Sequence, residues 1–243
     1  MKRIIGFTVS ICILIGLFVL GYNQYTYVSV LDLNNPSDWS VKKLTYHAAH
    51  GNIDASVILG TLYEQGLKVP KDPEKALKYY MMASLKGSDI GSLNAGRLLK
   101  NTDPLMASKF FALSAQKGNV TAKQQLGLLM ISSDPRSITI YDPKIALKWF
   151  KSAAMDGDTI SMINMSNIYN TGLNPIPINY NESLHWTYIA MNFERNPQVK
   201  NSLSEDIKSL ITKTGNFYKK NHRLWDDEIK AINNRIILNS KSS

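Results

Sequence analysis

A run of sixteen residues occurs three times in the chain, in phase and without gaps. Each copy begins with Asp-Pro, has alanine at its fifth position, continues with an aromatic pair and ends in glycine: residues 72–87 (DPEKALKYYMMASLKG), 103–118 (DPLMASKFFALSAQKG) and 142–157 (DPKIALKWFKSAAMDG). Successive copies begin 31 and 39 residues apart. Self-similarity with such a spacing is typical of solenoids, in which each unit is one helix pair. The repeat therefore predicts an all-α protein built of helix hairpins.

The segment before each run contains a glycine in the middle of a helical pattern. These glycines are Gly60, Gly96 and Gly127, and each has a small residue five positions earlier. A glycine inside a helix costs about 1 kcal/mol relative to alanine, so its recurrence needs a structural reason. We expect small residues to let the two helix backbones of a hairpin approach closely, and the aromatic pairs to fill the space between units. A fourth, degraded copy spans 160–172 and 181–192, with Ser166 in place of the glycine.

Both ends of the second helix of each unit are marked in the sequence. Aspartate is a favourable N-cap and proline fits the first helical position, so each Asp-Pro predicts a helix start. Glycine suits the left-handed backbone that ends a helix. The expected N-caps and terminal glycines are Asp72, Asp103, Asp142, Gly87, Gly118 and Gly157.

These residues resemble the Sel1-like repeat family, which is related to the tetratricopeptide repeats. The first complete copy carries the family pattern at Ala55, Leu59, Gly60, Tyr63, Gly66, Val69, Asp72, Lys75, Ala76, Tyr79, Tyr80, Ala83 and Gly87. The third copy keeps Ala122, Leu126, Gly127, Asp142, Ala146, Trp149, Phe150, Ala153, Ala154 and Gly157. The resemblance covers about residues 36–192. It implies a right-handed α-solenoid of helix–turn–helix repeats, which the departures in the second and fourth copies make irregular.

The N-terminus predicts export. Lys2 and Arg3 precede an uncharged run over residues 4–20, and no further Lys or Arg occurs before Lys42. Such asymmetry keeps the N-terminus in the cytoplasm and sends the rest across the membrane. We expect a hydrophobic helix in residues 1–21, as a signal anchor or as a signal peptide cleaved after Gly21, with residues 22–35 as a tether. The protein would be periplasmic, tethered to the inner membrane by residues 4–20, or secreted to the periplasm if cleaved. The alternative is a buried N-terminal helix.

The chain is then expected to hold the solenoid in residues 36–195 and a C-terminal helical cap in residues 196–243. The cap prediction rests on two apolar stripes at helical spacing. The stripes consist of Leu203, Ile207, Leu210 and Ile211, and of Leu224, Ile229, Ile232 and Ile236. The alternative role for this tail is a helix pair that binds a partner.

The net charge of +9 does not predict nucleic-acid binding. Basic residues are spread along the repeats, and the densest run, KKNHR at 219–223, is followed at once by DDE. A run this short is typical of a solvated helix face. An anionic lipid surface or an acidic protein fits the positive charge better.

No pattern in the sequence predicts catalysis, a cofactor or a metal. His47 and His50 are one helical turn apart but have no third ligand nearby, and His50 suits a helix C-cap. His185 replaces Lys148 of the third copy and is expected to be a surface substitution. The only cysteine is Cys12, so the repeats hold no thiol nucleophile.

The first helices of the hairpins have a face that is not needed for packing between helices. Positions three residues apart share that face and would build a largely amide stripe across copies. They are Ile58 and Thr61, Asn94 and Arg97, Gln125 and Leu128, and Asn164 and Asn167. The loops inserted in the third and fourth copies are a second candidate, with Tyr141, Ile176 and Tyr180 as anchors. Our predicted partner-binding residues are Asn94, Arg97, Gln125, Asn164, Asn167, Tyr141 and Tyr180. The alternatives are that the stripe is simply solvated and that the loop residues pack back on the domain.

The predicted function is binding of another protein without chemistry. The family resemblance implies a narrower hypothesis, because small exported members resemble immunity proteins that occlude type VI secretion phospholipase effectors. The partner would then be a lipase effector toxin. The alternative is a membrane-anchored scaffold or adaptor for envelope assembly or signalling. An enzyme or a cell-wall-binding module is a third hypothesis, disfavoured by the lack of a catalytic cluster. The oligomeric state stays open.

Overall fold

The computed structural model describes residues 40–242 and is helical in the way the repeats predict. Its helices are α2 (Val41–Ala49), α3 (Ile53–Gln65), α4 (Pro73–Leu85), α5 (Asp89–Leu99), α6 (Pro104–Gln116), α7 (Val120–Met130), the 3-10 helix η2 (Pro135–Ile140), α8 (Pro143–Ala154), α9 (Thr159–Thr171), α10 (Tyr180–Phe193), α11 (Pro197–Thr214) and α12 (Phe217–Ser242). Within residues 40–242 the only β pairing is an isolated bridge between Leu173 and Ile176. The predicted all-α solenoid class is confirmed. The expected N-terminal helix and tether lie outside the described residues.

The chain divides into two compact units, Met1–Lys86 and Gly87–Ser243, and each is described by itself. In the first unit, α3 packs on both α2 and α4. Its core contains Leu44, Ala48, Ala55, Leu59 and Leu62. The rings of Tyr63 and Tyr79 stack on each other with centroids 5.7 Å apart, and both pack against this core.

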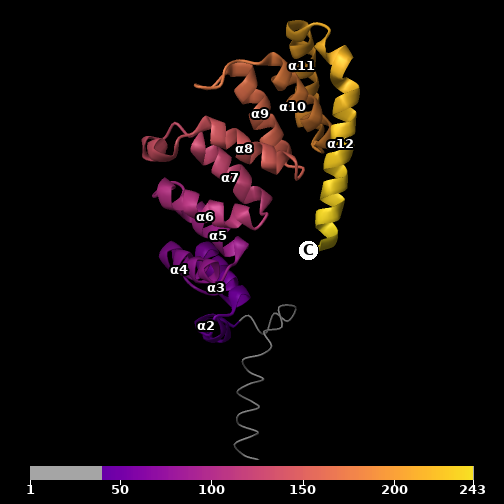
Figure 1. Ribbon diagram of the computed structural model, residues 1–243. Coiled ribbons are helices and arrows are strands. Elements are labelled where there is room, and N and C mark those ends of the chain that lie inside the picture. The colour runs from indigo at the N-terminus through magenta and orange to yellow at the C-terminus, as the bar shows by residue number, and fades with distance from the viewer. Residues whose placement is uncertain (1–39, 243) are drawn as a thin grey trace, which may run out of the picture. The chain divides into compact units, whose positions relative to one another are not determined.

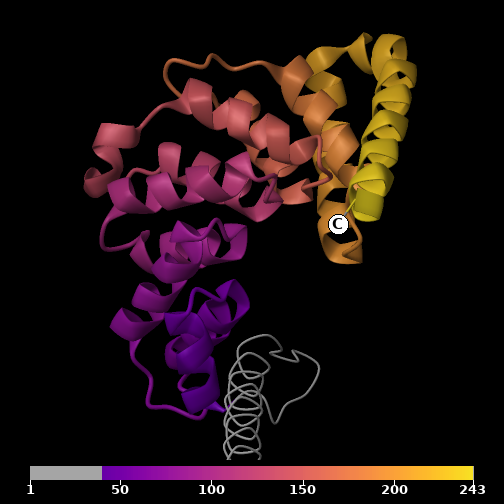
Figure 2. The same cartoon turned by 60° about the horizontal axis from the view of Figure 1, so that its bottom comes forward.

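In the second unit, each helix from α5 to α10 packs against the next one along the chain (Figure 1). The first helices of successive hairpins are linked near their N-terminal ends, where Asn119, the N-cap of α7, donates a hydrogen bond to Asp89 of α5 over 3.0 Å. Gln124 of α7 likewise donates to Asp158, the N-cap of α9. Both α11 and α12 lie against α10, and a second view shows α12 running alongside it (Figure 2).

The predicted helix ends are confirmed. Asp72, Asp103 and Asp142 are the N-caps of α4, α6 and α8, and each side chain accepts a hydrogen bond from the backbone N–H three residues on. The terminal glycines adopt positive φ angles of 89° at Gly87, 92° at Gly118 and 91° at Gly157. These local signals set where each helix begins and ends.

The mid-helix glycines make room for rings, which refines the expectation of close backbone approach. A Cβ atom on Gly127 would lie 2.7 Å from Cε1 of Phe150, closer than van der Waals contact allows. A Cβ atom on either of the other two mid-helix glycines would also overlap a ring, that of the second residue of the aromatic pair in the same repeat. The glycine–ring pairs are Gly60 with Tyr80, Gly96 with Phe111 and Gly127 with Phe150. The repeated glycine therefore lets the following helix bury one aromatic side chain in its own hairpin.

The C-terminal stripes are confirmed on α11 and partly wrong on α12. Leu203, Ile207 and Leu210 are buried, as expected. On α12, however, Leu224 is 66% exposed and its neighbour Trp225 is buried in its place. Trp225 packs with residues of α10 and α11 in one apolar cluster, and this contact sets the face that α12 turns inward.

Candidate functional site

Three of the four pairs of the predicted amide stripe lie on first helices of the second unit, one pair each on α5, α7 and α9. The fourth pair, Ile58 and Thr61, lies on α3 in the first unit. Arg97 and Asn167 are exposed, whereas Asn94, Gln125 and Asn164 are half-buried. The Nδ2 atom of Asn164 is inaccessible to solvent and has no hydrogen-bond partner among the described residues. The accessible part of the stripe is therefore narrower than the sequence predicts.

The inserted loops divide into parts that face solvent and parts that pack back. Ile138 on η2 is 74% exposed and Tyr141 is 38% exposed. Ile176, in contrast, is buried in the core between α8, α9 and α10. Tyr180 packs on the cluster around Leu184, with the ammonium of Lys213 4.6 Å from its ring centroid. Tyr141 thus lies at the surface, while Tyr180 packs with apolar residues of α10, α11 and α12.

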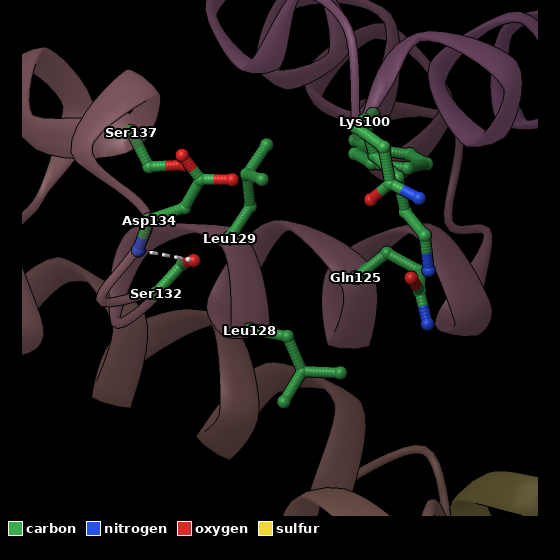
Figure 3. Close-up of a pocket in the computed structure, with 9 residues that line it drawn as sticks. Lys100, Gln125, Leu128, Leu129, Ser132, Asp134 and Ser137 are labelled. Atoms are coloured by element: carbon green, nitrogen blue, oxygen red, sulfur yellow. Dashed lines mark hydrogen bonds between the residues drawn. The ribbon is translucent and has the colours of Figure 1, made fainter.

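A small cavity, which we call the loop hollow, lies where the second and third repeats meet. It is lined by Lys100, Asn101, Phe111, Gln125, Leu128, Leu129, Ser132, Asp134 and Ser137, and its volume is about 190 Å³. Figure 3 shows the hydroxyl and carboxylate side chains on one side, Lys100 and Gln125 on the other, and the leucines between them. Two residues of the predicted stripe, Gln125 and Leu128, thereby meet the inserted loop.

The long loop of the third repeat closes the hollow because it folds back as η2. This short helix contacts both α6 and α7. Arg136 fixes it: Nη1 donates to the carbonyl oxygen of Asn101, while Nε and Nη2 bind the carboxylate of Asp134. These hydrogen bonds from the guanidinium group, with one from the backbone N–H of Arg136, lower the pKa of Asp134. The short loop of the second repeat and the long loop of the third are thus held together by one side chain.

An ion-pair network around the buried carboxylate of Asp156, which sequence reasoning missed, joins α7 to α12. Nζ of Lys123 lies 2.5 Å from Oδ2 of Asp156, and the two side chains are only 9% and 5% exposed. Nε of Arg235 approaches Oδ1 of the same carboxylate at 2.8 Å. The sequence carries one signal of this role, since Asp156 occupies the position of Lys86 and Lys117 in the earlier copies.

The expectation that His185 is a surface substitution is wrong. Its side chain is 16% exposed, and Nε2 lies 2.8 Å from Oε2 of Glu228 on α12. Burial alone would lower the pKa of His185, but interactions with the carboxylates of Glu182 and Glu228 outweigh it and raise the pKa to about 9. The imidazole is therefore charged near neutral pH and ties α12 to α10.

Tyr188 makes a second polar contact between these helices. Its hydroxyl donates to Oδ1 of Asp226 over 2.8 Å. Burial, together with this hydrogen bond, raises the pKa of Tyr188 to about 12. Trp225 lies against the same side of α10, with its ring centroid 5.5 Å from that of Tyr188. The side of α10 that carries His185 and Tyr188 is thus covered by α12.

Residues 40–242 contain no group of three or more His, Cys, Asp or Glu side chains arranged to hold a metal. His50 is the C-cap of α2, and its Nδ1 atom lies 2.7 Å from the carbonyl oxygen of Tyr46, as the sequence suggests. None of the described helices combines the length and apolar character that crossing a membrane requires.

These features define a class: an all-α solenoid of helix hairpins whose exposed faces are suited to protein contact. The Sel1 repeat model matches residues 53–88, 126–158 and 159–190, so the chain contains Sel1 repeats at these three positions. It matches no curated protein.

Several solved structures are similar to this chain. A Sel1 repeat protein from Oxalobacter formigenes is similar with a TM-score of 0.53 and 21% identity, over 72% of this chain and 69% of that one. Two immunity proteins from Pseudomonas aeruginosa, each 20% identical, give TM-scores of 0.40 and 0.41. These alignments cover 79% and 87% of this chain, and 80% and 79% of the two immunity proteins. At 21% identity, the similarity to the protein from Oxalobacter formigenes concerns the fold alone.

Proposed function

We propose that this protein binds another protein without catalysing a reaction, through the first-helix face and the inserted-loop edge of its second unit. The observation that carries the proposal is the exposure of Arg97, Asn167, Ile138 and Tyr141 on these surfaces. Helix-pair solenoids use such faces for recognition. A mixture of amide, basic and aromatic side chains is suited to a protein interface.

Within this function, we propose an immunity protein that binds and occludes a type VI secretion phospholipase effector in the periplasm. The sequence resemblance to small exported Sel1-like proteins supports this narrower role, as does the charge pattern of residues 2–42. Occlusion needs only a large complementary surface over the active-site cleft of the toxin. Tethering to the inner membrane by residues 4–20 would place the protein where a lipase attacks.

Capture experiments test the binding function. The full-length chain, solubilised in mild detergent and immobilised, is expected to retain one protein from envelope extracts in near-equal molar amount. Repeated failure to retain any protein from extracts of cells that express the chain would contradict the proposal.

A toxicity assay separates immunity from the alternative role of an envelope scaffold. If the chain is an immunity protein, deletion of its gene should poison cells only in the presence of effector-armed siblings, and re-expression should restore survival. Survival of the deletion strain under attack would end the immunity hypothesis. An envelope defect without any attacker would favour the scaffold.

A further inference from the structure

We propose that the loop hollow receives a carboxylate side chain, from aspartate or glutamate, that the bound protein presents. This inference rests on the proposed protein-binding function and adds the chemistry of the residue at the centre of the contact. It is carried by the charge, the hydrogen-bond donors and the size of the hollow.

The uncompensated charge at the hollow is positive. Lys100 lines it, and no described residue forms an ion pair or hydrogen bond with its ammonium group. The one carboxylate in the lining, Asp134, is already bound by Arg136, whose Nη2 atom lies 2.5 Å from Oδ2. Because Arg136 neutralises Asp134, Lys100 is left to attract an incoming anion.

Hydrogen-bond donors surround the same space. Ser137 is 1% exposed and lines the hollow, yet its Oγ atom has no hydrogen-bond partner within residues 40–242. A buried hydroxyl without a partner is unfavourable, so a ligand that accepts its hydrogen bond gains affinity. Ser132 accepts a hydrogen bond from the N–H of Asp134 and keeps its own hydrogen to donate. Nε2 of Gln125 donates to Gln124 and has a second N–H.

The dimensions favour one side chain over a larger molecule. A volume of about 190 Å³ is well below the roughly 300–1,000 Å³ of sites for drug-sized ligands. It exceeds the roughly 30 Å³ share of one water molecule. Leu128, which is half-buried, supplies apolar surface for the methylene groups of the guest, with the edge of Leu129 beside it. The net charge of +9 also favours encounter with an acidic partner.

A titration monitored by NMR tests this chemistry without the natural partner. N-acetyl-L-glutamate is added to the ¹⁵N-labelled full-length chain in mild detergent at constant ionic strength, with N-acetyl-L-glutamine as the neutral probe. We expect saturable shifts at the amides of Lys100, Gln125, residues 132–134 and residues 136–137 with glutamate, and at least tenfold weaker binding of glutamine. Absent or non-saturable shifts, or equal binding of both probes, would overturn the inference.

Two variants and one control make the test specific. Lys100→Met and Ser137→Ala should each weaken glutamate binding, Lys100→Met by tenfold or more. Lys109→Met is the control, because Lys109 is an exposed residue of α6 that does not line the hollow. This variant should bind glutamate as tightly as the unaltered chain. Binding that survives Lys100→Met would overturn the inference.

The same variants keep this inference distinguishable from the proposed function. If Lys100→Met and Ser137→Ala retain a captured protein as strongly as the unaltered chain, the hollow is not the contact but the binding function stands. If no protein is captured at all, the binding function fails, and the titration still decides whether the hollow selects a carboxylate.

Discussion

Oγ of Ser166 lies 2.6 Å from Oγ1 of Thr187, at the position where each earlier repeat packs a ring against a glycine. Ser166 aligns with Gly127, and Thr187 aligns with Phe150. The fourth repeat has therefore changed both members of the contact, replacing an apolar ring and its space by two small hydroxyl side chains that hydrogen-bond. Ser183 completes this buried group at 3.0 Å from Ser166. The mid-helix glycine of each earlier repeat is thus one member of a glycine–ring pair.

Gly127→Ala should destabilise the second unit by about 1–3 kcal/mol, because the added methyl group overlaps the ring of Phe150. Helix propensity alone would predict a gain of about 1 kcal/mol. Chemical denaturation followed by circular dichroism measures the difference. Phe150→Leu should reduce the added cost of Gly127→Ala. Thr121→Ala, at an exposed position of the same helix, should change stability by no more than about 0.5 kcal/mol. A stabilising Gly127→Ala would contradict the paired-contact explanation.

Much of the fold could be predicted because its signals are local. A helix start at Asp-Pro, a helix end at glycine and a repeated alanine each depend on only a few neighbouring residues. These signals can therefore be interpreted without knowledge of the rest of the chain. The missed features depend on distant contacts. His185 is buried by a partner 43 residues away in sequence, and η2 is fixed by Arg136 on Asn101. On α12, a shift of one residue from Leu224 to Trp225 turns the inward face by about 100°. The loop hollow could not be predicted for the same reason.

Asp156→Asn should destabilise the second unit by about 3–5 kcal/mol, because it leaves the buried ammonium of Lys123 without its counter-charge. Arg235 loses its partner too, so amides of α12 should exchange faster in hydrogen-exchange experiments.

Removing both partners of that buried pair provides the decisive comparison. The double change Lys123→Met with Asp156→Asn should lower the free energy of unfolding by less than the sum of the two single changes. Lys230→Met, in an exposed pair with Asp227, is the matched control and should change stability by less than about 1 kcal/mol. Strict additivity of the two buried changes would show that the pair is not coupled.

The contact of His185 predicts a pH-dependent stability. Because its pKa rises from 6.5 to about 9 on folding, the contribution is fully present below about pH 6.5 and is lost as pH rises through about 9. A pKa difference of this size corresponds to about 3–4 kcal/mol of unfolding free energy. Denaturation of the unaltered chain and of His185→Gln, followed by tryptophan fluorescence, should therefore give stabilities that converge between pH 6.5 and 10.

Two carboxylate substitutions control for this pH effect. Glu228→Gln should remove much of the pH dependence, because it removes the closest carboxylate. Glu205→Gln, in an exposed pair with Lys208 on α11, should leave it intact. A constant difference between the unaltered chain and His185→Gln across this pH range would contradict the assignment.

The affinity of the captured protein for a double variant of the first-helix face tests the central claim most directly. Arg97→Glu with Asn167→Arg alters two exposed positions, and avoids Asn164 because its amide nitrogen is buried. Lys109→Glu with Gln116→Arg makes the same net charge change on exposed positions of α6. We predict that the first pair weakens binding at least tenfold with helicity unchanged, and that the second pair does not. Equal affinity of both variants and the unaltered chain would contradict a binding surface on the first helices.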